Sequence, residues 1–96
     1  MKTIDEKLKK QITEQFRKLQ EMVKNTKATN LTELFEELDS NGLSVYFGLD
    51  NDFFYAEYEN IIADVHINKN GEKAVHNDVQ VFDDDGNRLE LHYFIN

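Results

Sequence analysis

Cysteine is absent from this chain of 96 residues, which excludes disulfides, thiolate zinc sites and cysteine nucleophiles together. Glycine is scarce: the four glycines, at positions 42, 48, 71 and 86, are isolated from one another, so no glycine-rich phosphate loop is present. The only serines, Ser40 and Ser44, lack the flanking pattern of a serine nucleophile. The sequence therefore carries no motif of the common nucleotide enzymes or of hydrolases that use a serine or cysteine nucleophile.

Long apolar runs are missing as well. No stretch approaches the roughly 18 apolar residues of a membrane span. The segment Met1–Lys10 is charged every few residues and has no apolar signal-peptide core. Hydrophobic residues still make up 40% of the chain and are well spread, so we expect a packed core and one domain at this length. We expect the protein to be soluble and cytoplasmic, with no membrane partner.

Lysine and arginine are absent from Ala28 to Asn68, although this stretch carries nine acids. Residues 1–27 hold eight bases and four acids, whereas residues 28–96 hold three bases and fifteen acids, for a net charge of −8. Such a field repels nucleic acid and raises the encounter rate with basic proteins. The simpler interpretation, that an acidic surface keeps a small protein in solution, stays open.

Two helices are predicted in the first 42 residues. Apolar residues recur every three or four positions in the first, at Ile4, Leu8, Ile12, Phe16, Leu19 and Val23, which indicates one long amphipathic helix. Asn30 followed by Glu33 reads as a helix cap with its capping-box partner, opening a short helix. Its apolar residues are Leu31, Leu34, Phe35 and Leu38. Gly42 is the natural residue for the left-handed turn after it.

From Leu43 onward the apolar period changes to two, which predicts strands. The first runs from Leu43 to Leu49. In the second, apolar positions are even up to Tyr58 and odd from Ile61, and one straight strand over residues 53–68 would be about 53 Å long at about 3.3 Å per residue. We therefore expect a bulge or bend near Glu59.

Two hairpins can be placed in register by pattern, because only a loop with an odd number of residues keeps odd positions opposite odd ones. The three-residue loops are 69–71 and 84–86, each with glycine in its left-handed position. This register places Val65 opposite Val75 and Val81 opposite Leu89; it also places Val79 opposite Leu91. The predicted fold is α+β: two N-terminal helices (residues 1–42) packed on one face of a four-stranded antiparallel β-meander (residues 43–96).

The same register gathers carboxylates and imidazoles on the other face of the sheet. Asp64 falls opposite His76 and Asp78 opposite His92, whereas His66 has no predicted partner. The two predicted pairs, Asp64 with His76 and Asp78 with His92, are candidate metal ligands or a general acid–base pair. The simpler interpretation is a set of cross-strand ion pairs on a solvated sheet face, because flat faces lack the concavity of most sites.

Six aromatic residues lie between Tyr46 and Tyr58, interleaved with acids. We assign Phe47, Phe54 and Tyr58 to the core. The others, with the neighbouring acids, are predicted to bind a partner: Tyr46, Asp50, Asp52, Phe53, Tyr55, Glu57 and Glu59. Stiff aromatic rings dominate binding energy at interfaces, and acids around them steer a basic partner. Ordinary sheet packing of aromatic residues is the alternative.

We therefore expect a non-catalytic acidic protein, without a cofactor, that occludes a basic protein partner. An immunity protein, or a phage-type inhibitor of a nuclease or other nucleic-acid enzyme, fits this description. It would act as a monomer or homodimer and would not bind nucleic acid itself. Successive acids such as Glu57 and Glu59 would lie about 6.6 Å apart in an extended strand and could mimic phosphates. The alternatives are a small metal-binding or hydrolytic protein using the Asp/His patch, and a self-associating structural or regulatory module using the first helix.

Overall fold

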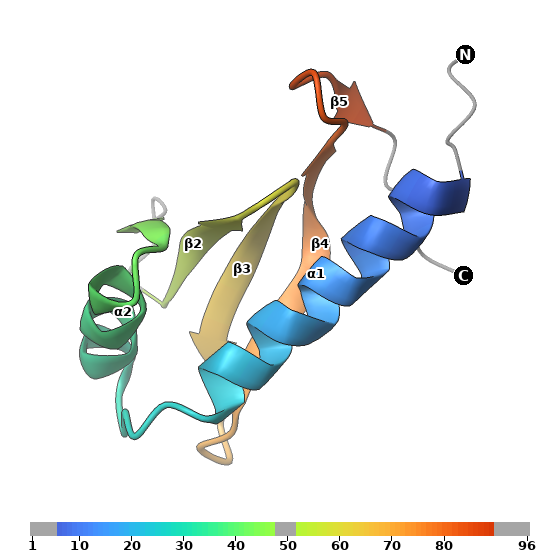
Figure 1. Cartoon of the computed structure of the whole chain (residues 1–96). Coiled ribbons are helices and arrows are strands. Elements are labelled where there is room, and N and C mark those ends of the chain that lie inside the picture. Colours follow the sequence, from blue (N-terminus) through green and yellow to red (C-terminus); the bar gives the residue numbers. More distant parts are fainter. Residues whose placement is uncertain (1–5, 48–51, 90–96) are drawn as a thin grey trace.

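Two helices precede an antiparallel sheet in the computed structural model, which describes residues 6–47 and 52–89 and, for residues 77–79, the backbone (Figure 1). The elements are α1 (Glu6–Lys24), α2 (Leu31–Ser40), β1 (Ser44–Phe47), β2 (Phe53–Tyr58), β3 (Ile61–Ile67), β4 (Lys73–Phe82) and β5 (Arg88–Leu89). The strands lie in the order β1-β2-β3-β4-β5, so each pairs with its neighbours along the chain. The predicted α+β class and antiparallel sheet are confirmed.

Helix α1 follows the predicted apolar stripe. Ile12, Leu19 and Val23 are fully buried, and Gln15 is the one polar residue buried among them. The helix presents its charged residues to solvent, which gives it the amphipathic character that packing against a core requires. The predicted start of the stripe at Ile4 lies outside the described residues.

Helix α2 begins as the sequence predicts, with one difference in its cap. Asn30 Oδ1 accepts a hydrogen bond from the Glu33 backbone N–H at 2.9 Å. Glu33 Oε1 accepts from the backbone N–H and the hydroxyl of Thr29, at 2.8 and 2.9 Å. The backbone bond from Thr29, followed by its hydroxyl bond, lowers the pKa of Glu33 because both stabilise the carboxylate. Glu33 thus connects Thr29, the residue before the N-cap, to the first turn of α2.

The predicted count of four strands is wrong, because residues 53–68 form two strands. Strands β2 and β3 are joined by the two-residue loop Glu59–Asn60, and Tyr58 pairs with Ile61. A two-residue loop sets even positions opposite odd ones. This explains the switch of apolar parity that the sequence analysis interpreted as a bend. The sheet therefore has five strands among the described residues, and the chain reverses direction at Glu59.

Glu59 has a φ of +53° and is the only non-glycine residue with positive φ in the described part of the chain. A side chain in this left-handed region costs about 1–2 kcal/mol. We expect Glu59→Gly to raise the free energy of unfolding by about 0.5–1 kcal/mol, after allowance for the greater freedom of glycine in the unfolded chain. Urea unfolding measures this change. Glu59→Ala is the control, because it removes the same carboxylate and keeps the Cβ; equal stabilisation by both variants would contradict backbone strain as the cause.

The two three-residue hairpins are confirmed. The backbone N–H of Asn68 donates to the Glu72 carbonyl at 2.8 Å, and that of Asp83 donates to the Asn87 carbonyl at 2.9 Å. Both loop glycines have a φ of +86°. Val65 pairs with Val75 and Val81 with Leu89, as predicted. The predicted partner of Val79, Leu91, lies outside the described residues.

Strand β4 carries two more residues than β3 in the middle of their pairing. Ile62 lies opposite Gln80 and Asp64 opposite His76, so two steps on β3 match four on β4. The apolar pattern predicts the irregularity at Glu59 instead. Because the number of extra residues is even, the core face of β4 keeps its odd positions on both sides of the shift, which is why the parity of the sequence gives no sign of it.

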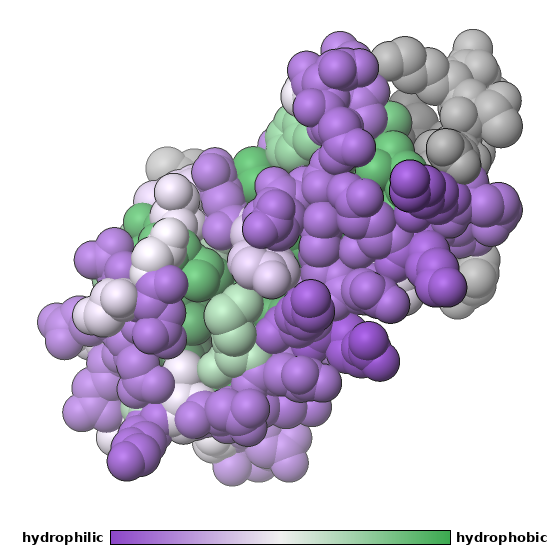
Figure 2. Space-filling view, viewed as in Figure 1, coloured by the Kyte–Doolittle hydropathy of each residue, from purple (hydrophilic) through white to green (hydrophobic). Residues whose placement is uncertain are grey.

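The core contains buried residues from α1, α2 and one face of the sheet. Its strand members are Phe54, Ala56, Ile61, Ala63, Val65, Val81 and Leu89, and its helix members include Ile12, Leu19, Val23, Leu34 and Leu38. The opposite side of the sheet, called the outer face below, carries Ser44, Tyr46, Phe53, Tyr55, Glu57, Ile62, Asp64, His66, Ala74, His76 and Gln80. On the helix side, hydrophilic residues cover most of the surface and hydrophobic atoms show between the helices (Figure 2).

Candidate functional site

Three aromatic rings on the outer face form a cluster, called the outer aromatic cluster here: Tyr46, Phe53 and Tyr55. Tyr46 and Tyr55 lie opposite each other on β1 and β2, with ring centroids 5.4 Å apart. Phe53 meets Tyr55 edge to face at 5.2 Å. Such contacts hold large rings in place beyond what area burial alone would do. Tyr46 is nevertheless 42% exposed, so the cluster offers stiff aromatic surface to solvent.

Two carboxylates share the face of the outer aromatic cluster: Glu57 on β2, and Asp64, which pairs with Tyr55 from β3. Glu57 is exposed, lies on the same face of β2 as Tyr55, and pairs with Ser44 at the start of β1. The pKa of the Tyr46 phenol is raised, first by burial and then by the charges of Glu57 and Tyr55. The Glu57 carboxylate thus adds to the effect of burial on the phenol. With no lysine or arginine between residues 28 and 68, this surface attracts positive charge.

An aspartate and two histidines continue the outer face onto β3 and β4. Asp64 lies opposite His76, as predicted, and its side chain contacts His66. The Nδ1 of His66 lies 3.2 Å from Asp64 Oδ1, and its Nε2 lies 3.1 Å from Asn68 Oδ1. The rings of His66 and His76 are 6.1 Å apart. The sequence did not predict these contacts, although a spacing of two along a strand places Asp64, His66 and Asn68 on one face.

The four candidate metal ligands are only partly described. Asp64 and His76 share the outer face, whereas His92 and the side chain of Asp78 lie outside the described part of the chain. Among the side chains that the structure describes, no group of three or more His, Cys, Asp or Glu is arranged to hold a metal ion. Two strand residues, Asp64 and His76, do not by themselves provide the closed set of four ligands of a structural metal site.

The remaining predicted partner-binding residues are distributed over the molecule. Asp52 is exposed in the turn before β2, and Asp50 lies outside the described residues. Glu59, at the tip of the β2–β3 hairpin, borders an open hollow of about 410 Å³ against α1, whose lining includes Lys7 and Lys10. Phe47, assigned to the core from sequence, lies on the core face but is 41% exposed and stacks on Phe35 at 4.6 Å.

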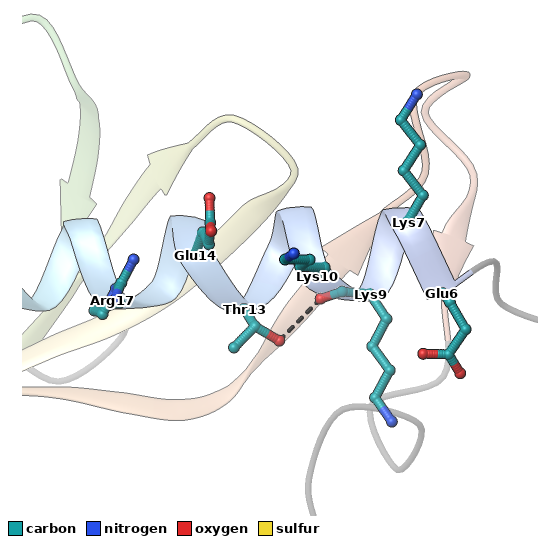
Figure 3. A pocket seen from close by; sticks show the side chains of 7 residues that line it. All are labelled: Glu6, Lys7, Lys9, Lys10, Thr13, Glu14 and Arg17. Carbon is teal, nitrogen blue, oxygen red and sulfur yellow. Dashed lines mark hydrogen bonds between the residues drawn. The ribbon is translucent and has the colours of Figure 1, made fainter.

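Helix α1 presents a second, basic surface. A concavity of about 770 Å³ follows its exposed side and is lined by Glu6, Lys7, Lys9, Lys10, Thr13, Glu14 and Arg17 (Figure 3). Lys7 and Lys9 extend to opposite sides of the helix. Their ammonium groups therefore do not converge on one ligand atom, which a small-molecule site requires. Helix α1 thus carries most of the positive charge of the described residues, whereas the outer face carries the carboxylates Glu57 and Asp64 and no lysine or arginine from β1 to β3.

The chain was compared with models of protein families, with curated proteins and with solved structures, and none of the three comparisons gave a match. Neither of the described helices is long and apolar enough to cross a membrane.

Proposed function

We propose that this protein is a non-catalytic binding protein whose outer sheet face docks onto a basic protein and occludes it. The observation that carries the proposal is the outer aromatic cluster with the carboxylates around it. In this proposal both helices lie against the core face and leave the outer face to the partner. An immunity protein, or a phage-type inhibitor of a nuclease or other nucleic-acid enzyme, acting in the cytoplasm, is the class of protein that fits.

Two physical arguments support this surface as the interface. Exposed tyrosine contributes a large, stiff contact area with a polar tip, and rings of this kind dominate the free energy of binding at interfaces. Glu57 and Asp64 carry charge on the same face, and their field raises the association rate with a basic partner. Aromatic anchors with a rim of one charge sign are the arrangement expected of a specific interface for an oppositely charged protein.

Mimicry of nucleic acid by a ladder of acids along one strand is not part of the proposal. Strand β2 ends at Tyr58, and Glu59 lies in the turn that follows. Glu57 and Glu59 are therefore not successive residues on one face of an extended strand, which is a correction to the spacing expected from the sequence. The proposal depends on overall charge and on the aromatic rings.

The test is a salt and charge-reversal experiment on a partner captured from cells that carry the gene. The captured protein is purified, and its affinity is measured by calorimetry. We expect it to be basic, to bind about tenfold more weakly when salt rises from 50 to 300 mM, and to lose a similar factor with Glu57→Lys. Glu21→Lys on α1 is the control, since it makes the same charge change at an exposed site on the helix that the proposal leaves out of the interface. Equal effects of the two substitutions, or no effect of salt, would contradict the proposal.

A further inference from the structure

Strand β1 leaves one edge of the sheet open. It stands at the end of the strand order, and in the part of the chain that the structure describes no strand pairs with its second edge. Its four residues, Ser44–Phe47, contain no charge and no proline. Proteins usually protect an exposed edge with a short strand, lysine, proline, a bulge or a covering segment, because unpaired backbone groups accept another strand. Strand β1 is short, but its sequence contains none of the charged or proline residues that block strand addition.

The hydrogen bonds of the sheet determine which backbone groups face that edge. Asn68 donates its backbone N–H to Glu72 on the β4 side. Backbone groups of an antiparallel strand point alternately to its two neighbours, so the even-numbered residues of β3 face β4 and the odd-numbered ones face β2. Val65 pairs with Phe54. The even-numbered residues of β2 are thus bonded to β3, and its odd-numbered residues face β1.

The backbone groups of β1 alternate in the same way. Tyr55 on β2 pairs with Tyr46, so the N–H and C=O of Tyr46 are directed into the sheet. The N–H and C=O of Val45 and Phe47 are then directed out of the open edge. Two donors and two acceptors stand about 6.6–7 Å apart along the strand, which is the spacing that an added strand matches.

The side chains beside the open edge select what can add to it. Phe47 is 41% exposed on the core side and stacks on Phe35 of α2, whereas Tyr46 is 42% exposed on the outer side. An incoming strand would place one row of side chains beside the Phe35–Phe47 pair and the alternate row beside Tyr46. Apolar residues suit the first row.

Charge selects between possible occupants. Helix α2 carries the exposed acids Glu33, Glu36 and Asp39 and the half-buried Glu37, and Glu57 lies on the outer side of the sheet. No base lies between residues 28 and 68. A second copy of this chain, with its net charge of −8, would bring like charges together at the same edge. A segment rich in lysine or arginine would instead be attracted from both sides.

We infer that β1 is a strand-addition site for an extended basic segment of the partner, with apolar and basic residues alternating along it. The segment would bond to the backbone of Val45 and Phe47 and continue the sheet beside the outer aromatic cluster. This inference rests on the proposed function and specifies how the partner engages the protein. Main-chain bonds would supply affinity, and the alternating side chains would supply selectivity.

Synthetic heptapeptides test the inference on the intact protein. The probe alternates lysine and valine; its controls are the same peptide N-methylated at every residue and a peptide alternating glutamate and valine. We expect binding of the lysine peptide at least about tenfold tighter than that of either control, because the first control lacks the donors and the second reverses the charge. Amide hydrogen exchange should slow at Val45 and Phe47 and change little at Tyr46, which is already bonded within the sheet.

Several outcomes would overturn the inference. These are equal binding of the N-methylated peptide, protection that appears on α1 instead of β1, and no added protection at β1 with about 1 mM peptide. A dimer whose Val45 and Phe47 amides are already protected without peptide would assign the edge to a second copy of the chain. Failure of the proposed function is distinguishable: the purified partner would then bind without sensitivity to Glu57→Lys, whatever the peptides do.

Discussion

Replacing Asn60 with alanine should lower the free energy of unfolding by about 2–4 kcal/mol, although Asn60 lies in a two-residue turn. Its amide oxygen accepts from Gln15 Nε2 at 2.9 Å and from Gln11 Nε2 at 3.1 Å. Its amide nitrogen donates to the Phe82 carbonyl at 2.9 Å and to Asp84 Oδ1 at 3.0 Å. One side chain therefore ties α1 to both the β2–β3 and β4–β5 turns.

The size of this effect follows from the burial of Gln15. Only 8% of Gln15 is exposed, and its Oε1 also accepts the backbone N–H of Asn60 at 3.0 Å. Without the Asn60 amide, the Gln15 amide nitrogen loses the acceptor that the structure gives it, and a buried polar group left without a partner costs about 1–3 kcal/mol. The turn geometry alone would not produce a loss of this size.

Urea unfolding of Asn60→Ala measures the loss, and Asn70→Ala serves as the control. Asn70 lies in the β3–β4 turn and makes one exposed bond of 3.3 Å, from the Glu72 backbone N–H to its side-chain oxygen. We expect a change of no more than about 0.5 kcal/mol there. Equal losses for the two variants would show that the Gln11–Gln15–Asn60 network contributes little to stability.

Tyr55→Ala should weaken binding of the basic partner about 30-fold or more, the effect expected of an aromatic hot spot. Tyr55 lies at the centre of the outer aromatic cluster, between Tyr46 and Phe53. Its removal takes away one ring and also the support that holds the other two in place. Calorimetric titration with the purified partner measures the loss, and circular dichroism verifies that the variant is folded.

Tyr58→Ala is the matched control for this substitution. Tyr58 lies on the same strand, and its side chain packs against the core. We expect this variant to lose stability, by about 2–4 kcal/mol, and to keep its affinity within about threefold. Loss of affinity by Tyr58→Ala with no loss by Tyr55→Ala would place the interface on the other side of the sheet.

Much of the fold follows from local signals in the sequence. Gly71 and Gly86 mark the three-residue loops, and both have the positive φ that a non-glycine residue seldom adopts. The parity of apolar positions then determines the register, as the pairing of Val65 with Val75 shows. The hairpin at Glu59 was missed because a glutamate in a left-handed conformation carries no such signal. The switch of apolar residues from even to odd positions is visible in the sequence, but a bend in one strand and a two-residue loop between two strands both produce it.

The sequence predicts the face of the sheet on which the candidate site lies, but not the side-chain contacts within the site. Alternation predicts that Tyr46 and Tyr55 emerge opposite the core, and the β1–β2 register pairs them. The predicted pairing of Asp64 with His76 is correct in register, and the contact of Asp64 with His66 depends in addition on side-chain rotamers. In the sequence, Gln15 is simply a polar residue beside the apolar stripe. Its hydrogen bonds to Asn60 could not be predicted, because only the tertiary structure brings the two residues together.

The most direct test of the central claim is a map of the partner's footprint by NMR on the isotope-labelled protein. We expect the signals of Tyr46, Phe53, Tyr55 and Glu57 to shift or broaden when the purified basic partner is added. Those of the exposed residues Lys10 and Arg17 on α1 should stay in place. A footprint centred on α1, with the outer aromatic cluster unchanged, would contradict the account.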